Sequence, residues 1–425
     1  MRRVHGMLAV RWIVSLAVLG LAVLILLAGC GVSARAGATT TNSPTATTPA
    51  QLHLAWQPMT MPPQASVTPY TLGFAPSDGD VVYACAVDPC ASSRQLHLWV
   101  TRDRSAHWTH LADLTVHAGS NRCGIVVDEW QPMSAVVAIN WAPMGASPGI
   151  SSYSSYATLD GGASWRQLTG PYPYLVRQLA TIAGVTYASI SVDAPGGEQN
   201  ELAVSRDALR TWQQIPQTQT FGLDRGAPGF WLDPKNGALL AEGTTATGTK
   251  LWSSDDLGAH WTALSTPASA GDLGLAQIVV QTQAGVWHLC IATSQGDGRT
   301  PPGGPTCSLD GGQTWQQWPG LKVAFTNPSK GTFYAQADVF ALDDSAAVLA
   351  AVTIPDFTNN TNTTTIYRLA PRAQQWQRIG DFDGQAYPIG LYPTASGDVL
   401  WADGQPVLGQ SGVTQGWQYA PYPFP

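Results

Sequence analysis

An eight-residue phrase recurs along this 425-residue chain and constrains its fold more than any other feature. Its clearest copy, at residues 308–315, reads Ser-Leu-Asp-Gly-Gly-Gln-Thr-Trp. The Asp and the hydroxyl side chains can hydrogen-bond to the backbone of their own turn, and Gly supplies the positive φ that tight turns require. The Trp opens the next strand with a large ring that needs burial. Each copy therefore predicts a β-turn followed by a strand.

Five copies keep both the Asp and the Trp, and two worn copies keep only the Trp and its strand. The residues predicted to shape these turns are Asp103, Trp108, Asp160, Gly162, Trp165, Asp207, Trp212, Asp256, Gly258, Trp261, Asp310, Gly312 and Trp315, with the worn copies around Trp376 and Trp417. Successive Trp residues are separated by 57, 47, 49, 54, 61 and 41 positions. A period of about fifty residues is typical of a four-stranded propeller blade.

The segments between these turns fit that unit. The first repeat predicts strands at 70–75, 81–87, 96–101 and 108–111, and the last predicts strands at 386–391, 399–402, 407–410 and 417–420. No stretch after residue 48 shows a helical period over ten or more residues. We therefore predict an all-β fold, a seven-bladed β-propeller of four-stranded blades, with six or eight blades as the alternatives.

One segment precedes the first repeat. Residues 52–59, which include Trp56, look like a lone strand, and a strand from one terminus often completes the last blade of a propeller. We expect this segment to pack beside the C-terminal blade near Trp417. The alternative is that it is merely the end of the preceding linker.

The phrase Ser/Thr-x-Asp-x-Gly-x-Thr-Trp resembles the Asp-box, or BNR repeat, of sialidases, sortilin-type receptors and photosystem II stability/assembly factors. The resemblance covers roughly residues 51–425. It implies a propeller whose boxes lie between the third and fourth strands of each blade, away from the functional mouth. It also implies that the box aspartates are structural and are not general acids. The resemblance does not imply an activity, because one fold serves many functions.

The N-terminus reads as a targeting segment. Arg2, Arg3 and Arg11 form a positively charged region before an apolar run over 12–27. This run leads into Leu-Ala-Gly at 27–29, which is followed by Cys30. This ending resembles the lipobox of bacterial lipoproteins, which implies that Cys30 is lipidated and becomes the mature N-terminus. The alternative is an uncleaved anchor, because the run extended to residue 32 is long enough to span a bilayer.

These features divide the chain into a lipoprotein signal peptide at 1–29, a Thr/Pro-rich tether at 30–50 and the propeller at 51–425. We expect an exported protein, anchored through its N-terminal lipid to the outer face of the bacterial cytoplasmic membrane or the cell surface. The 21 basic and 28 acidic residues, without any basic cluster, argue against nucleic acid as a partner. We expect a monomer.

Six cysteines are present, and lipidation of Cys30 leaves five in an exported chain. Cys290 and Cys307 fall in neighbouring strands of the fifth repeat, so we predict a disulfide between them. Cys85, Cys90 and Cys123 compete for one further bond, and the sequence does not select the pair. We predict no metal site from these three, since no Cys-x-x-Cys occurs.

Catalytic chemistry of the sialidase type requires three arginines that clamp a carboxylate, a Tyr–Glu pair and an acid/base Asp. The Arg-Ile-Pro motif of these enzymes is absent, and Arg378 begins only a weak echo of it. The arginines left as candidates for a clamp are Arg94, Arg122, Arg177, Arg225 and Arg299.

Other candidate groups are weaker. Asp128-Glu129 and Asp343-Asp344 are adjacent carboxylates, which point to opposite faces on a strand and are expected in turns. The histidines are scattered along the sequence: His97, His107, His110, His260 and His288.

We therefore expect no catalytic residue, no cofactor and no metal. The favoured function is a lipid-anchored, non-enzymatic binding or scaffold module with an unidentified protein or carbohydrate ligand. The alternatives are a sialidase-like exo-glycosidase and an assembly factor that binds a membrane protein, as the photosystem II factors do.

Overall fold

The computed structural model describes part of the chain. The described residues are 54–62, 71–75, 77–88, 95–117, 120–141, 152–168, 175–194, 197–215, 230–233, 237–245, 248–267, 276–283, 285–293, 299–335, 337–343, 345–356, 361–382, 386–393, 399–406 and 418–422. The chain divides into two units, Met1–Ala50 and Gln51–Pro425, and every described residue belongs to the second. The predicted signal peptide, Cys30 and the tether lie outside the described residues. Across the described residues, no helix has the length and apolar character needed to cross a membrane.

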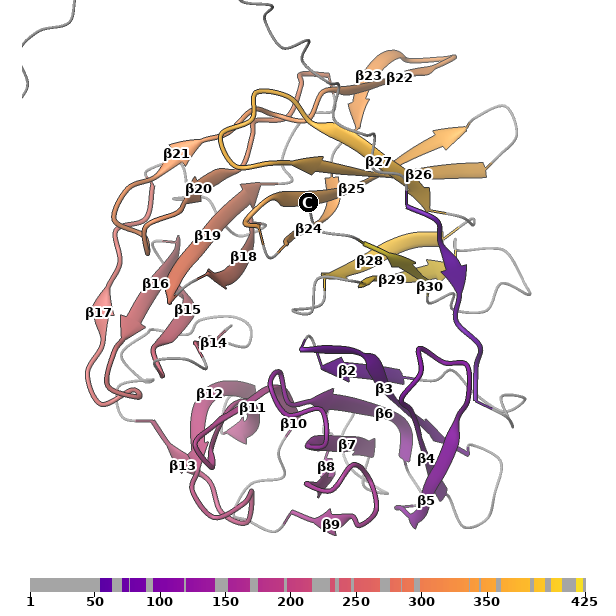
Figure 1. The fold of residues 1–425 in the computed structure, drawn as a ribbon, viewed down its shortest axis with the longest axis vertical. Helices are drawn as coiled ribbons and strands as arrows, with labels where there is room; N and C mark the ends of the chain where they lie inside the picture. Colours follow the sequence, from indigo (N-terminus) through magenta and orange to yellow (C-terminus); the bar gives the residue numbers. More distant parts are fainter. Residues whose placement is uncertain are drawn as a thin grey trace, which may run out of the picture. The chain divides into compact units, whose positions relative to one another are not determined.

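The described residues form seven four-stranded antiparallel sheets and one two-stranded sheet (Figure 1). In chain order the first four are β2 (Thr71–Ala75), β3 (Asp78–Val87), β4 (Gln95–Thr101) and β5 (Thr109–Thr115); β6 (Ser120–Val127), β7 (Ala135–Trp141), β8 (Ser152–Thr158) and β9 (Arg166–Gln167); β10 (Leu175–Ile182), β11 (Val185–Ala194), β12 (Gly197–Ser205) and β13 (Gln213–Gln214); β14 (Phe230–Leu232), β15 (Leu239–Thr245), β16 (Gly248–Ser254) and β17 (Thr262–Ala263).

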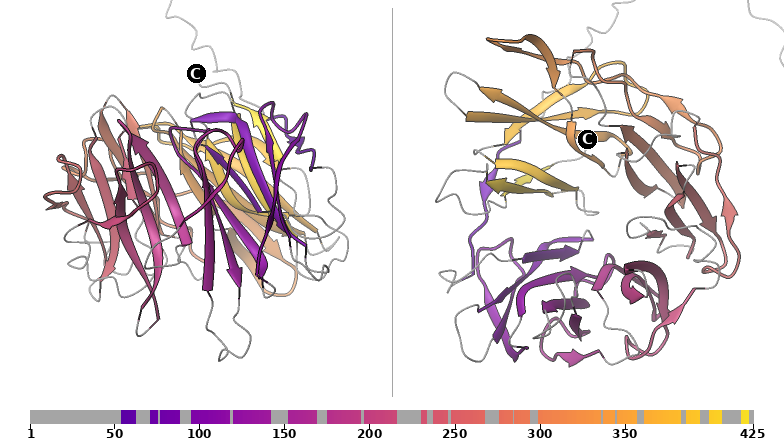
Figure 2. Two further views of the ribbon diagram at one scale, coloured as in Figure 1. Left: turned by 90° about the horizontal axis from the view of Figure 1, so that it is seen from below. Right: turned by 180° about the vertical axis from the view of Figure 1, so that it is seen from behind.

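The remaining sheets are β18 (Ala276–Gln283), β19 (Val286–Thr293), β20 (Thr306–Ser308) and β21 (Gln316–Gln317); β24 (Ala337–Leu342), β25 (Val348–Asp356), β26 (Thr361–Leu369) and β27 (Gln377–Phe382); and β28 (Ala386–Pro393), β29 (Val399–Pro406) and β30 (Gln418–Pro421) with β1 (Gln57–Pro58). The prediction of an all-β fold is confirmed. Figure 2 shows the strands running side by side, with their turns at the strand ends.

Apolar clusters join successive sheets face to face. Between the first and second sheets, Tyr83 and Leu98 pack with Ile125 and Val137, and all four are buried. The run from Val81 to Val87 is buried at every position because the second strand of a sheet is covered on both faces. Such strands lack the alternation of polar and apolar residues that is typical of a sheet with one solvent-exposed face.

The fourth strand is only two residues long in five of the seven sheets, namely β9, β13, β17, β21 and β1. Each follows a Trp directly and is followed by an apolar residue. The first backbone bond after the strand recurs as well: Leu264 N donates to Leu251 O at 2.9 Å, and Trp318 N to Pro305 O at 2.8 Å. The fourth strand is therefore a Trp-x-x-apolar unit in these sheets.

The seventh sheet combines both ends of the described chain. β1 pairs antiparallel with β30, with Gln57 opposite Tyr419, so the expected pairing of the N-terminal strand is confirmed. The order is β28–β29–β30–β1, which makes β30 the third strand and corrects the prediction that 417–420 is the fourth. The predicted strand 407–410 and Trp417 lie outside the described residues.

Trp56, and not Trp417 as predicted, precedes the fourth strand of this sheet. The stretch Trp56-Gln57-Pro58-Met59 repeats the Trp-x-x-apolar unit of the other fourth strands, and Met59 is buried at 7% exposure. The interval from Trp56 to Trp108 is 52 residues, within the range of the other intervals. The repeat is thus circularly offset, with its last strand at the start of the domain.

Two disulfides connect described cysteines. Cys290 in β19 and Cys307 in β20 lie directly opposite each other, with Cα atoms 4.1 Å apart, and form the pair that the sequence predicts. Cys85 in β3 bonds to Cys123 in β6 and so links the first sheet to the second. Of the three open pairings this is the one present, and Cys90 lies outside the described residues.

The two-stranded sheet is a hairpin of β22 (Val323–Asn327) and β23 (Gly331–Ala335). Phe325 and Phe333 stack across it with ring centroids 5.9 Å apart. Figure 1 places it beside the sixth sheet, and its insertion explains why the interval from Trp315 to Trp376 is the longest of the series.

Candidate functional site

The box turns are closed hydrogen-bonded units. In the copy at 308–315, Asp310 Oδ1 accepts from Thr314 N at 2.9 Å and from Ser308 Oγ at 2.8 Å, and Thr314 Oγ1 donates to Oδ2 at 2.5 Å. Ser308 Oγ in turn accepts from Gly312 N at 2.8 Å. The same pattern recurs around Asp103, Asp160, Asp207 and Asp256, with His107 and His260 replacing Thr in two copies.

These bonds determine the charge of the box carboxylates. The hydrogen bonds from the hydroxyl and backbone N–H of Thr314 hold the pKa of Asp310 at about 2. The corresponding bonds from His107, Ser164, Thr211 and His260 hold the pKa of their partner aspartates at about 2 as well. A carboxylate that stays ionised, with its acceptors occupied by its own turn, is unsuited to act as a general acid.

Three tryptophans of the repeat, Trp108, Trp315 and Trp376, hydrogen-bond to the backbone of a neighbouring sheet. Trp315 Nε1 donates to Ser265 O, just beyond the fourth sheet's last strand, at 2.7 Å, and Trp376 Nε1 donates to Pro319 O beyond the fifth's at 2.8 Å. Trp108 Nε1 donates to Thr60 O, just beyond β1, at 2.6 Å. The rings are half-buried, whereas the sequence predicted fuller burial, because one edge faces solvent at the outer strand.

The arginine candidates are largely outside what the structure describes. Arg94 and Arg225 are not described, and Arg122 and Arg177 lie on β6 and β10 without a described side chain. The Arg299 guanidinium lies 6.0 Å from the centroid of the Phe333 ring. Arg378, which begins the weak match to the sialidase motif, pairs with Asp381 on the same strand, β27.

The adjacent carboxylates lie in turns between the first and second strands of their sheets. Asp128 is fully buried and its Oδ1 accepts from the backbone N–H groups of Trp130 and Gln131 at 2.9 and 3.0 Å. Burial raises the pKa of Asp128. Burial, together with the Asp128 carboxylate, raises the pKa of Glu129 to about 8.

Asp343 occupies the same kind of turn in the sixth sheet. It accepts from Arg368 Nε at 2.9 Å and from the Tyr422 hydroxyl at 3.0 Å, and all three residues are buried. Tyr422 follows β30, so this network fastens the seventh sheet to the sixth. Asp344 lies outside the described residues. Asp128, Glu129 and Asp343 therefore lie in turns, as expected.

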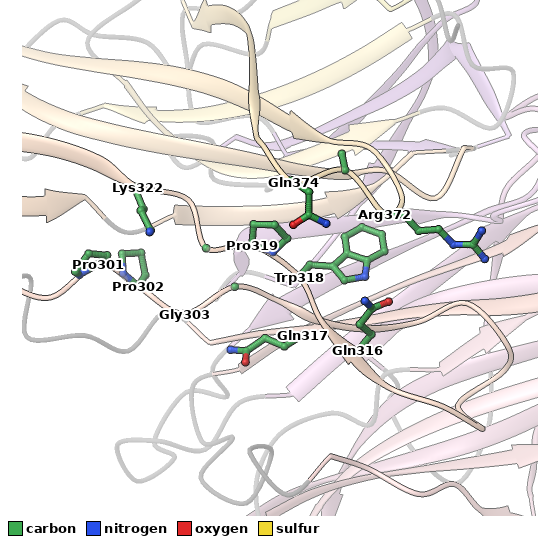
Figure 3. Close-up of a pocket in the computed structure, with 13 residues that line it drawn as sticks. Pro301, Pro302, Gly303, Gln316, Gln317, Trp318, Pro319, Lys322, Arg372 and Gln374 are labelled. Carbon is green, nitrogen blue, oxygen red and sulfur yellow. The ribbon is translucent and has the colours of Figure 1, made fainter.

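A groove lies where the worn sixth box meets the outer strand of the fifth sheet (Figure 3). It has a volume of about 630 Å³ and is lined by Pro301, Pro302, Gly303, Gly304, Gln316, Gln317, Trp318, Pro319, Gly320, Lys322, Arg372, Ala373 and Gln374. A second cavity of about 640 Å³ adjoins it and shares Pro319, Gly320, Lys322 and Gln374.

The walls of this groove are fixed by backbone packing. A Cβ on Gly304 would lie 1.7 Å from Trp318 O, and one on Gly320 would lie 2.3 Å from Pro302 O. Trp318 is 5% exposed, so its ring forms the base of the groove and packs with the fifth and sixth sheets. The polar lining groups, Lys322, Arg372 and the carboxamides, are exposed above it.

The charged side chains that line the groove are all positive. Neither Lys322 nor Arg372 forms an ion pair with any residue that the structure describes. The described lining includes no carboxylate, histidine or thiol. Two cationic side chains without a described ion-pair partner, next to glutamine carboxamides, favour a polar, anionic ligand.

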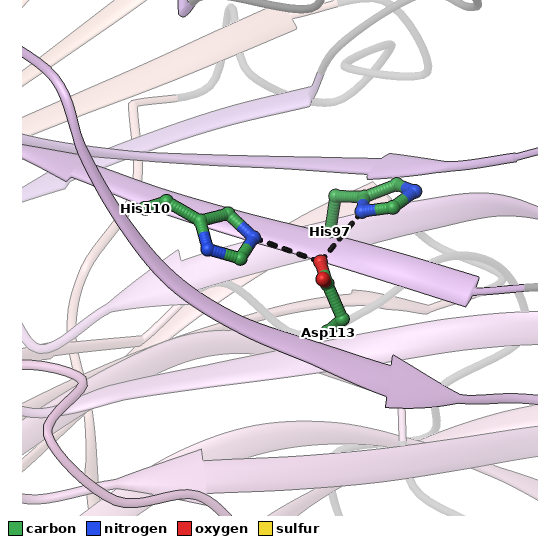
Figure 4. Close-up of side chains that lie close together, drawn as sticks. All are labelled: His97, His110 and Asp113. Atoms are coloured by element: carbon green, nitrogen blue, oxygen red, sulfur yellow. Dashed lines mark hydrogen bonds and ion pairs between the residues drawn. The ribbon is translucent and has the colours of Figure 1, made fainter.

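A second cluster lies on the outer strands of the first sheet (Figure 4). His97 Nδ1 is 2.6 Å and His110 Nε2 is 2.8 Å from the same oxygen, Asp113 Oδ1. The view of these histidines as scattered is therefore wrong for this pair. Partial burial raises the pKa of Asp113, but hydrogen bonds from His97 and His110 outweigh it, and the net pKa is lowered.

A β-bulge creates this cluster. Residues 110 and 113 are three apart and in a regular strand would point to opposite faces. The register shifts between Leu98 and Trp99, which leaves one extra residue in β5 and returns both side chains to one face. Sequence spacing predicts β4 and β5 as neighbours but contains no signal for the bulge, so the cluster was missed.

No family model matches this sequence. No curated protein matches it either. Among solved structures, an ulvan lyase of polysaccharide lyase family PL25 is 9% identical, covers 88% of this chain and 94% of its own, and has a TM-score of 0.45.

Two further solved structures are similar. An α-L-arabinanase of Penicillium chrysogenum in complex with arabinobiose is 13% identical over 76% of this chain and 99% of its own, with a TM-score of 0.40. An intramolecular trans-sialidase from Ruminococcus gnavus is 13% identical over 83% of this chain and 94% of its own, with a TM-score of 0.37. At these values the similarities carry no argument about activity, and the function has to be inferred from this chain's own residues.

Proposed function

We propose that this chain is a seven-bladed β-propeller, exported and anchored through lipidated Cys30, that binds an acidic polysaccharide without turning it over. Seven four-stranded sheets, the last completed by β1, support the propeller. The apolar run before Cys30 supports export and anchoring. The binding function depends on one observation, the chemistry of the groove beside Trp318.

The groove presents the groups that an acidic sugar chain needs. Lys322 and Arg372 offer positive charge to carboxylate groups, with Arg able to bind them in bidentate fashion. Gln316, Gln317 and Gln374 carry carboxamides, each of which can both donate to and accept from sugar hydroxyls. The adjoining second cavity extends the surface beyond one sugar unit.

The groove is also preorganised. Gly304 and Gly320 allow the two wall segments to meet backbone to backbone, so little ordering accompanies ligand binding. Glycoside hydrolysis normally requires a pair of carboxylates that flank the scissile bond. Since the described lining has none, the groove supports binding rather than hydrolysis.

The test uses the full chain, purified in detergent, in native gels that contain polygalacturonate. We expect retardation by polygalacturonate and none by dextran, a neutral glucan. The double variant Lys322→Gln/Arg372→Gln should weaken the retardation at least tenfold, because each charge-assisted contact contributes about 1.5–3 kcal/mol.

The matched control is Lys330→Gln/Arg210→Gln, which removes the same charge from exposed positions outside the groove. It should bind as the unmodified chain does. Equal losses in both double variants, or no retardation at all, would exclude the groove as the site. Release of a fluorophore from a sialoside would instead favour the sialidase-like alternative, and capture of one membrane protein in place of polysaccharide would favour the assembly factor.

A further inference from the structure

The cluster of His97, His110 and Asp113 is separate from the groove and has the composition of a metal site. Its three ligand atoms, one from each side chain, all lie within 4.8 Å of one another. The two imidazole nitrogens approach a single carboxylate oxygen from adjacent strands, as Figure 4 shows. Two imidazoles and one carboxylate form a donor set that suits zinc and neighbouring divalent transition ions.

The rings are held in place by packing. Trp99 lies opposite His110 in the β4–β5 ladder, and its ring centroid is 5.8 Å from that of His110 and 5.7 Å from that of His97. Trp99 itself is 3% exposed in the apolar cluster of the first sheet. The buried indole therefore restricts both imidazoles before any ion arrives.

The cluster is accessible to ions in solution. The side chains of His97, His110 and Asp113 are 23%, 46% and 40% exposed. Three protein ligands with solvent access leave a coordination position for water, the arrangement found in open zinc sites.

Coordination of an ion requires the three ligand atoms to adjust their present spacing. Zinc bonds of about 2.0–2.2 Å place tetrahedral ligand atoms roughly 3.3 Å apart. The observed nitrogen–oxygen distances are 2.6 and 2.8 Å, so the carboxylate oxygen has to withdraw by a fraction of an ångström. The two imidazole nitrogens, which lie within 4.8 Å of each other, have to adopt the same spacing.

The boxes provide an internal comparison. His107 pairs with Asp103, and His260 pairs with Asp256, each as one histidine on one carboxylate. Only the cluster on β4 and β5 combines two histidines with one carboxylate among the described residues. A hydrogen bond between one histidine and one aspartate is therefore sufficient for the structure of a box. The second histidine of the cluster, His110 beside His97, is not explained by such a structural role.

We propose that His97, His110 and Asp113 bind one Zn²⁺, which cross-links the two outer strands of the first sheet and keeps water in its open position.

The experiment titrates the full chain, purified in detergent without a polyhistidine tag, with Zn²⁺ in equilibrium dialysis and with Co²⁺ in visible spectroscopy. We expect one equivalent of Zn²⁺ with micromolar affinity, cobalt absorption bands in the visible range and a rise in Tm when Zn²⁺ is present. His110→Asn and Asp113→Asn should each lose the equivalent, the bands and the Tm response.

His260→Asn is the matched control, since it removes a histidine from a carboxylate that has no second imidazole. It should keep all three responses. Circular dichroism without metal establishes that each variant is folded. The proposal fails if the unmodified chain binds no Zn²⁺ at millimolar concentration, or if His110→Asn binds the same equivalent as the unmodified chain.

Discussion

Each of the five boxes contains two consecutive residues with positive φ. The pairs are Arg104 and Ser105, Gly161 and Gly162, Ala208 and Leu209, Leu257 and Gly258, and Gly311 and Gly312. The second position is buried in every copy, so its residue must be small or must pack. Leu209 satisfies this requirement by burying its side chain against the third sheet, despite a φ of 65°.

Gly311→Ala isolates the backbone cost of this conformation. Gly311 has a φ of 74°, and a Cβ added there meets no atom within 4 Å, so the substitution introduces strain without a clash. We expect the free energy of unfolding to fall by about 1 kcal/mol, the cost of placing an L-residue in the left-handed region. Urea titration measures it. Gly303→Ala, in a loop without positive φ, should differ little, and an equal loss there would refute the strain argument.

Glu129 gives the protein a pH dependence near neutrality. Its pKa of about 8 in the folded state exceeds the ordinary 4.5, so between these values the folded chain retains a proton that the unfolded chain releases. Stability from this group is therefore complete below pH 4.5 and falls as the pH rises towards 8.

Glu129→Gln should remove that fall. We expect the Tm of the variant, relative to the unmodified chain, to be higher at pH 8 than at pH 5, measured by thermal unfolding in matched buffers. Asp255→Asn, at an exposed box position, serves as the control and should show no such difference. The same offset at both pH values would mean that Glu129 is ionised in the folded chain.

At the scale of the element, four of the five boxes act as hydrogen-bonded caps on a strand of only two residues, namely β9, β13, β17 and β21. Fourth strands of two residues, such as β17 and β21, make too few ladder bonds to hold themselves in place. The Asp–Thr and Ser–Gly bonds, together with the Trp behind them, fix the turn that positions the strand.

Acid should loosen these caps together. The five box aspartates have a pKa of about 2 in the folded chain, below the ordinary 3.8, so their contribution is present above pH 3.8 and is lost as the pH falls through 2. We expect the urea midpoint to fall most steeply between pH 4 and pH 2. Asp310→Asn, which has no titratable group there, should show a shallower fall, and a parallel curve would contradict the assignment.

The elements were predictable to the extent that they follow the repeat. The box spacing predicted the sheets, and the strands at 81–87 and 96–101 match β3 and β4 closely. The hairpin β22–β23 was not predicted, because an insertion has no counterpart in the other repeats. The bulge in β5 was not predicted either, since a bulge depends on the partner strand.

For the whole molecule, the two sites show where sequence reasoning stops. The groove combines a loop at 301–304, the end of β21 and a turn at 372–374, which only packing of successive sheets brings together. The meeting of His97 and His110 at Asp113 could be predicted only by someone who knew the register of the β4–β5 ladder. Conversely, the Cys290–Cys307 bond followed from strand order alone, because the two strands are neighbours in the chain.

Trp56→Ala tests how much the first strand contributes to the last sheet. Trp56 packs edge-on against Phe382 with centroids 5.3 Å apart, within the cluster that holds Leu54, Leu391 and Tyr422. We expect a loss of about 2 kcal/mol, less than for a fully buried Trp because the ring is half-exposed. Urea titration measures the loss, and limited proteolysis should then cut before β2.

Val286→Ala, at a side chain that is 40% exposed, is the control and should change stability little. If Trp56→Ala also left stability and proteolysis unchanged, β1 would not be a working part of the last sheet.

The pairing of β1 with β30 also sets the order of events in folding. Gln57 and Tyr419 are 362 positions apart, so β1 cannot pair until β30 is available. Six sheets can form from contiguous chain, but in the seventh β1 has no partner strand until β30 has been synthesised. A chain truncated before Gln418 would therefore leave both β1 and β29 as open strand edges, each a template for association with another chain.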